Sequence, residues 1–226
     1  MQIYPNSLAK TVESVEEAQF FGKKVARATK EEVASWIASR QGLQGSYADM
    51  FAPTTYDIKN GVRLFTGEVI RSGASLRHVS GEEACRALVH LNPSSKTVKQ
   101  ALQRATTGMS LRLENCGGNK HGMFCCGTCD PALWRNITVG GLSSAEKWLV
   151  SGMKALKAHR DNQGSWRRFP FFYTLLALLE IDSPAARDEM KYAASKCERY
   201  LARNKPTRLI VQRRIAVAER VLELPN

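Results

Sequence analysis

Helix-start signals recur along this chain, and they constrain its fold more than any other local feature. Thr29–Glu32, Ser80–Glu83 and Ser143–Glu146 each place a hydroxyl three residues before a carboxylate, so each can satisfy two free backbone amides at a helix start. Asp130-Pro131 and Ser183-Pro184 add two further starts, because a capping acceptor followed by proline loses no hydrogen bond there. No stretch shows the alternation that is typical of a strand. The sequence therefore predicts an all-α fold.

The same signals and the apolar faces predict nine helices packed as antiparallel pairs. Residues 171–179 are apolar nearly all round, which is typical of a central helix with neighbours on several sides. The last helix carries an apolar stripe of Val211, Ile215, Ala218 and Leu222, which we expect to face the core. The predicted helices span 13–27, 30–41, 81–92, 95–107, 131–139, 144–160, 169–181, 184–203 and 207–223. The side chains expected to form one core are Trp148, Met153, Leu156, Phe172, Leu175, Leu176, Leu179, Val211, Ile215 and Leu222.

Changes in composition divide the chain into three expected regions. Residues 1–110 form an N-terminal helical region, in which the segment 42–79 is broken by Gly and Pro and reads as an irregular connector or lid. Residues 111–142 hold a Cys-rich loop and a short helix, and residues 143–226 form a C-terminal helical array.

The termini and apolar runs bear on where the protein resides. The longest apolar run, residues 169–179, is about half of the roughly 20 residues that a membrane span needs. Met1–Pro5 lacks the basic start and apolar stretch of a secretory signal. We therefore expect a cytoplasmic protein with reduced thiols and no membrane partner.

Four of the six cysteines lie within 14 residues, in a glycine-rich segment. Cys126 and Cys129 have the two-residue separation that lets both sulfurs reach one tetrahedral metal ion. Cys116 and either Cys125 or His121 can complete a set of four ligands. Zinc is the metal that such a set favours. The segment therefore predicts a metal-binding loop.

Other interpretations of the cysteines remain open at this point. Thiolates at this spacing also bind iron–sulfur clusters, although the segment does not match a ferredoxin run of cysteines. Cys126 and Cys129 also fit a redox pair, because they precede the helix at Asp130, whose dipole would lower a thiol pKa. His121 is a candidate ligand or a base beside a thiolate. Reduced thiols that only pack are a third alternative, and we prefer it for Cys85 and Cys197.

Positive charge is concentrated in the C-terminal half of the chain. The whole chain carries a formal net charge of +12, and residues 101–226 hold 20 Lys and Arg against 11 Asp and Glu. The basic side chains around the last turn between helices are candidates for binding nucleic acid or another polyanion, and a solvated basic face is the alternative. These candidates are Arg203, Lys205, Arg208, Arg213 and Arg214.

Two tryptophans are followed directly by arginine, Trp134-Arg135 and Trp166-Arg167. A ring beside a guanidinium group suits stacking on a base while the cation holds a phosphate. Core tryptophans with arginines that cap helices or pair with carboxylates explain the same pattern, and we prefer that interpretation.

A short segment resembles a known family. Asp161-Asn-Gln163-Gly164-Ser165-Trp166, then Pro170 and Tyr173-Thr174 in the run to Leu178, resembles one repeat of the prenyltransferase and squalene-cyclase α/α-toroid superfamily. The resemblance, over residues 161–178, implies helix pairs packed as a ring, and for a chain of this length a partial toroid-like array. It does not extend to activity, because the chain has no Asp-x-Asp-Asp acid motif and no matching set of Asp, Cys and His ligands.

Two functions of different classes follow from these features. The first is a metal-stabilised helical module with a basic surface that binds nucleic acid without base specificity. The alternative is an enzyme with a pocket beside the Cys-rich loop, using Cys126, Cys129 or His121 for thiol, redox or metal-assisted chemistry. The nucleophile elbow, phosphate loop, dinucleotide fingerprint and His-Glu-x-x-His helix do not occur in the sequence.

Overall fold

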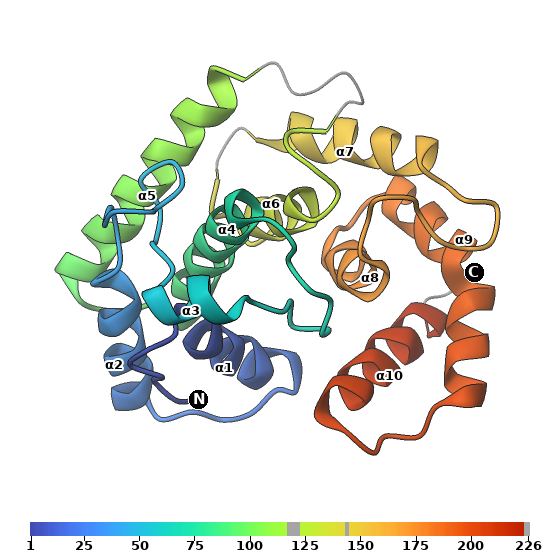
Figure 1. The fold of residues 1–226 in the computed structure, drawn as a ribbon, viewed down its shortest axis with the longest axis horizontal. Coiled ribbons are helices and arrows are strands. Elements are labelled where there is room, and N and C mark those ends of the chain that lie inside the picture. The colour runs from blue at the N-terminus through green and yellow to red at the C-terminus, as the bar shows by residue number, and fades with distance from the viewer. Residues whose placement is uncertain (117–122, 143–144, 224–226) are drawn as a thin grey trace. The chain divides into compact units, whose positions relative to one another are not determined.

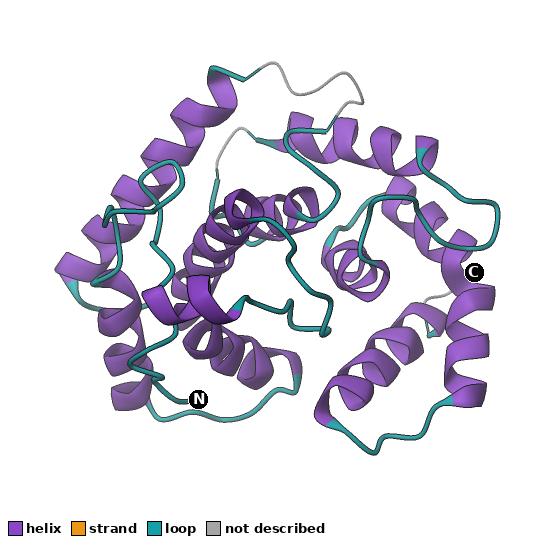
Figure 2. Cartoon of the chain, in the orientation of Figure 1, coloured by secondary structure: helices purple, strands orange, loops and turns teal. Residues whose placement is uncertain are grey.

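The computed structural model describes residues 1–116, 123–142 and 145–223, and within these ranges the fold is all-α (Figures 1 and 2). The described residues contain ten helices and no strand, with three isolated β-bridges. The helices are α1 Leu8–Phe20, α2 Arg27–Ala38, α3 Thr55–Asn60, α4 Gly73–Leu91, α5 Lys96–Glu114, α6 Cys129–Thr138, α7 Glu146–Ala158, α8 Phe171–Glu180, α9 Pro184–Arg203 and α10 Leu209–Leu222. The predicted fold class is confirmed. No helix in these ranges combines the length and the apolar character that crossing a membrane requires.

The chain forms two compact units that are discontinuous in sequence. The N unit comprises Met1–Val62, Ile70–Gly117 and Asn136–Ala145, and the C unit comprises Arg63–Val69, Gly118–Arg135 and Glu146–Asn226. The division into the regions 1–110, 111–142 and 143–226 that the sequence suggests stays a prediction.

The N unit is built around α4, which packs against α1, α2 and α5. This helix buries charged and polar side chains, among them His78 and Glu82. Their burial is tolerated because they are paired: Nε2 of His78 lies 3.1 Å from a carboxylate oxygen of Glu82, and the second oxygen accepts a 2.6 Å hydrogen bond from Asn136. The buried faces of α4, the central helix of this unit, therefore include charged and polar side chains.

The C unit is built around α8, which packs against α9 and α10, while α7 packs against α9. Seven consecutive residues, from Phe172 to Leu178, are buried, which confirms the predicted central helix. The predicted start of α9 is also confirmed, because Ser183 Oγ accepts a hydrogen bond from the Ala186 amide and Pro184 is the first helical residue. Of the expected core side chains, Leu179, Val211, Ile215 and Leu222 are only partly buried.

Several predicted helix starts are wrong. Ser80 lies in the middle of α4, which begins at Gly73 because the Ser72 hydroxyl accepts a hydrogen bond from the Ser75 amide and caps the helix there. Thr29 lies inside α2, which has no side-chain cap. Ser7 caps α1 through the Lys10 amide, so this helix begins at residue 8 rather than 13. The signal at Ser143 lies outside the described residues.

The predicted buried stripe of α10 is confirmed only at Ala218, because Val211, Ile215 and Leu222 are partly buried. Its buried side chains are Arg213, Val217, Ala218 and Val221. The guanidinium of Arg213 lies 4.1 Å from the centroid of the Phe65 ring and donates a 2.9 Å hydrogen bond to the Phe65 carbonyl oxygen. Because Arg213 is buried against these partners, it determines which face of α10 packs inward, and Val211 and Ile215 are left only partly buried.

The expected irregular connector contains ordered structure. It holds α3 and the first part of α4, and residues 63–69 form a turn closed by a bridge between Arg63 and Val69. This turn belongs to the C unit. The Glu68 carboxylate accepts hydrogen bonds from the Phe172 and Tyr173 amides at 2.9 and 3.3 Å, so it caps α8, whose own N-cap Pro170 offers no side-chain acceptor.

Candidate metal centre

Three cysteine side chains meet at the start of α6. The sulfurs of Cys126 and Cys129 are 3.4 Å apart, and those of Cys125 and Cys129 lie within 4.8 Å of each other. Two thiolates on one tetrahedral zinc ion, with bonds of about 2.3 Å, have sulfurs about 3.8 Å apart. Cys129 is buried, Cys126 is partly buried and Cys125 is exposed. Cys129 therefore lies close enough to each of the other two sulfurs to share an ion with it.

A buried carboxylate holds the turn that carries these cysteines. Asp130 is only 1% exposed and accepts hydrogen bonds from the Phe124 and Cys125 amides at 3.1 and 2.9 Å. The amides of Cys129 and Asp130 both donate to the Cys126 carbonyl oxygen, at 3.0 and 2.9 Å. Asp130 thus lies within α6 and orders the loop before the helix, so its predicted role as the residue that caps this helix is wrong.

Gly127 packs the same turn closely against the backbone at Arg168, in another segment of the C unit. A Cβ atom at this position would lie 2.2 Å from the Arg168 carbonyl oxygen and 2.7 Å from the Arg168 carbonyl carbon. No other residue type fits such a close approach of backbone. Next to the turn, Phe124 packs edge-on against Trp148, with centroids 5.3 Å apart. The position of the cysteines is therefore fixed by packing as well as by hydrogen bonds.

The thiols of Cys125 and Cys129 have raised pKa values, so they keep their protons more tightly than cysteines in water do. Hydrogen bonding to Cys126 raises the pKa of Cys125 from 9.0 to about 11. Hydrogen bonds with Cys125 and Cys126, followed by burial, raise the pKa of Cys129 well above its ordinary range. These shifts are opposite to the lowered pKa that the helix dipole predicts for a redox thiol. A divalent cation reverses them, because it displaces the protons and takes the thiolates as ligands.

The remaining cysteines and the histidine of the predicted site fall elsewhere. Cys116 follows α5 in the N unit and is partly buried. His121 lies outside the described residues, so the membership of both in a ligand set stays a prediction. Cys85 and Cys197 are buried, with pKa values that burial raises, and Cys197 reaches about 11. Their predicted packing role agrees with this burial.

The basic candidates differ in their exposure. Arg203, Lys205 and Arg208 are exposed. Arg214 is partly buried and donates a 2.7 Å hydrogen bond to the Thr66 carbonyl oxygen. Arg213 is only 3% exposed, so its expected place on a polyanion-binding surface is wrong, because its guanidinium is used inside the C unit.

Both tryptophans and Arg135 lie in the core, in agreement with the preferred interpretation, whereas Arg167 is exposed. Trp134 and Trp166 are 1% and 3% exposed. Arg135 is buried and makes two hydrogen bonds to the Glu180 carboxylate, at 3.0 and 2.9 Å. Neither ring is available to stack on a base.

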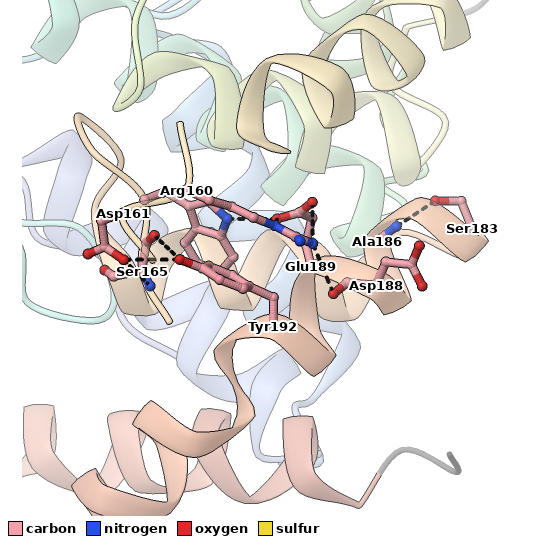
Figure 3. A network of polar contacts seen from close by, with 9 residues as sticks. Arg160, Asp161, Ser165, Ser183, Ala186, Asp188, Glu189 and Tyr192 are labelled. Carbon is pink, nitrogen blue, oxygen red and sulfur yellow. Dashed lines mark hydrogen bonds and ion pairs between the residues drawn. The ribbon is translucent and has the colours of Figure 1, made fainter. Parts of the chain in front are cut away.

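The segment that resembles a toroid repeat forms a polar network between the end of α7 and α9 (Figure 3). Glu189 is 2% exposed and accepts hydrogen bonds from Arg160 at 3.0 and 2.9 Å and from the Trp166 indole at 2.8 Å. Asp161 accepts from the Ser165 amide at 2.9 Å and from the Tyr192 hydroxyl at 3.1 Å. These residues therefore pair with one another and fasten the turn after α7 to α9.

Comparisons with family models, curated proteins and solved structures found no match to this chain. The resemblance of residues 161–178 to a toroid repeat stays a prediction for that reason, and function is argued below from the site alone.

Two residues of the site, Asp130 and Gly127, have roles that sequence reasoning does not predict. Such reasoning assigns Asp130 to the wrong backbone amides, and the need for Gly127 depends on Arg168, which is distant in sequence. The run Cys-Gly-Thr-Cys-Asp-Pro does contain a local signal, because an Asp beside a short turn commonly binds nearby amides.

Proposed function

We propose that this chain is a zinc-stabilised helical binding module, with Cys125, Cys126 and Cys129 among the zinc ligands. The observation that carries the proposal is the convergence of three sulfurs on one turn, with 3.4 Å between two of them. Zinc prefers thiolate ligands, and a turn ordered before binding loses less entropy when the ion arrives.

A structural role for the ion is favoured over a catalytic one. Cys129 is 0% exposed, so a substrate in solution cannot reach its thiol. Structural zinc sites hold four protein ligands, and the sequence offers Cys116 or His121 for the fourth position. The enzyme alternative has no comparable support in the geometry of the turn.

Elemental analysis of chain purified without a metal-affinity tag tests the zinc assignment. We expect about one zinc ion per chain, and Cys129→Ser should reduce this to below about a tenth of an equivalent. Cys197→Ser is the matched control, because Cys197 is equally buried but lies on α9. Separate Cys116→Ser and His121→Ala variants identify the fourth ligand. Wild-type chain with less than about a tenth of an equivalent of any metal contradicts the assignment.

The partner that we propose is a nucleic-acid backbone, bound through phosphates and without base specificity. Support comes from the net charge of +12 and from the segment 199–218, which carries six Lys and Arg and no Asp or Glu. Arg199, Arg203, Lys205 and Arg208 of this segment are exposed. Phosphate contacts of this kind release counterions and do not depend on sequence.

Binding of a fluorescent duplex and a fluorescent single strand at about 50 mM salt tests the partner. Affinity should fall steeply towards physiological salt, and charge reversal at Arg203, Lys205 and Arg208 should weaken it at least about tenfold. Reversal of Lys147, Lys154 and Lys157, which are exposed on α7, changes the net charge equally and is the control. Absence of binding to both probes at micromolar protein contradicts the proposal, and equal loss in the two triple variants contradicts its location.

A further inference from the structure

We propose that Cys126 and Cys129 form a reversible disulfide by exchange with a low-molecular-weight disulfide, and that this bond displaces the metal ion. The inference rests on the proposed zinc site and adds its regulation. Both cysteines are reduced in the structure, and their sulfurs are 3.4 Å apart. A disulfide bond of about 2.05 Å therefore needs the sulfurs to approach by about 1.4 Å, within the reach of side-chain rotation.

The backbone selects this pair among the three thiols. The Cys129 amide donates to the Cys126 carbonyl oxygen at 3.0 Å, which closes a turn whose first and fourth Cα atoms are less than about 7 Å apart. That separation is the one that disulfides span, about 4.4–6.8 Å. Cys125 and Cys126 are adjacent in the chain, so a bond between them would have to distort the peptide that joins them. The pair Cys126–Cys129 combines the 3.4 Å approach of its sulfurs with a backbone turn of suitable width.

Exposure assigns different roles to the two sulfurs. Cys126 is partly exposed, whereas Cys129 is buried. The Cys126 thiolate attacks one sulfur of the small disulfide, forms a mixed disulfide and expels the first small thiolate. Cys129 then gives up its proton, attacks the Cys126 sulfur and expels the second. Two protein thiols are oxidised, one disulfide is reduced to two thiols, and the reverse exchange restores the starting state.

The disulfide and the metal ion exclude each other. A disulfide sulfur carries no negative charge and is no longer a thiolate ligand, so one bond removes two of the proposed ligands together. The ion, in turn, stabilises only the reduced form. With free zinc at ten times its dissociation constant, the ratio of reduced to oxidised chain should rise about tenfold.

Equilibration in glutathione disulfide and glutathione mixtures, with and without added zinc, tests the switch. We expect intact mass to fall by two hydrogen atoms per chain, zinc to appear on a chromogenic chelator in step with that loss, and dithiothreitol to reverse both. Cys125→Ser should still form the disulfide, whereas Cys126→Ser should not. Circular dichroism confirms that each variant remains helical.

Two results overturn the inference. One is a zinc-loaded wild-type chain that stays reduced and loaded across the whole series. The other is a disulfide that peptide mapping assigns to Cys125. A third result is a wild-type chain that forms the Cys126–Cys129 bond but never contained zinc. It would contradict the proposed zinc site and the coupling of disulfide formation to zinc release, but not the thiol–disulfide exchange itself. The zinc analysis of the reduced chain thus separates the two failures.

Discussion

The cysteine turn, residues 123–130, and the basic turn, residues 203–214, are both predicted from the sequence to be functional, yet they differ in the structure. In the cysteine turn, three predicted ligands meet within one hydrogen-bonded turn. In the basic turn, Arg213 points inward to Phe65, a residue 148 positions away in sequence. Close spacing can bring side chains together by local geometry alone. Whether a long cationic side chain is buried or exposed depends on the carbonyl groups and rings that the fold brings next to it from distant parts of the chain.

The loss of a core leucine should change the free energy of unfolding more than any other substitution proposed here. It is the reference against which the substitutions in the two turns are compared. Leu176 is 2% exposed in α8, so Leu176→Ala should lower the free energy of unfolding by about 2–5 kcal/mol. Leu209→Ala is the control, because Leu209 is 48% exposed. Chemical denaturation measures both. A change of less than about 0.5 kcal/mol for Leu176→Ala would show that α8 is not central to its unit.

Arg213→Ala tests whether the basic turn contains a structural arginine. The change removes the hydrogen bond to the Phe65 carbonyl and the contact with its ring, so unfolding should become easier by about 1.5–3 kcal/mol. Arg208→Ala should alter stability by less than about 0.5 kcal/mol, because Arg208 is exposed. Equal effects of the two substitutions would remove the distinction between buried and surface arginines.

Gly127→Ala tests whether packing positions the cysteine turn. The added methyl group would overlap the Arg168 carbonyl, and relief of such an overlap costs about 1–3 kcal/mol. Zinc affinity should fall at the same time, because the turn has to move. Thr128→Ala, in the same turn, is the control. Wild-type stability and zinc affinity in the glycine variant would show that the turn moves freely away from residue 168.

The pH dependence of the zinc-free chain is the smallest expected effect. The folded pKa of Cys125, about 11, lies above its ordinary value of 9.0. The stability that this thiol contributes is therefore complete below about pH 9 and is lost as the pH rises towards about 11. Chelator-treated wild type should lose stability over that interval more steeply than Cys125→Ser. Parallel curves for the two proteins would contradict the raised pKa.

The sequence predicts the C unit better than the N unit, and their central helices explain why. Helix α8 is apolar nearly all round, so hydrophobicity alone identifies it. Helix α4 buries His78 and Glu82, which pair with each other and with Asn136. Such pairing makes charged residues compatible with a core, but a hydrophobicity pattern assigns them to the surface. Ser80 and Glu83 therefore resemble the start of a helix, and the sequence does not predict the first turns of α4, which begins at Gly73.

For the candidate site, the spacing of cysteines in the sequence predicts which of them lie close together. The contacts that the site makes with distant segments cannot be predicted from the sequence. The positions of Cys125, Cys126 and Cys129 in one turn follow from their spacing. The contact of Gly127 with the Arg168 backbone joins segments about 40 residues apart, so no local pattern predicts it. The inward turn of Arg213 has the same origin, since its partner belongs to a turn in the N-terminal half of the chain.

Titration with cobalt(II) tests the metal site most directly, because tetrahedral cobalt reports thiolate ligands by its absorption. We predict that the reduced chain saturates at about one equivalent of cobalt, with a sulfur-to-metal charge-transfer band in the near ultraviolet that zinc abolishes by displacement. The band should weaken in Cys125→Ser and Cys126→Ser, disappear in Cys129→Ser and persist in Cys197→Ser. A reduced wild-type chain that develops no such band, or one whose band is unchanged in all three variants of the turn, contradicts a metal centre at these cysteines.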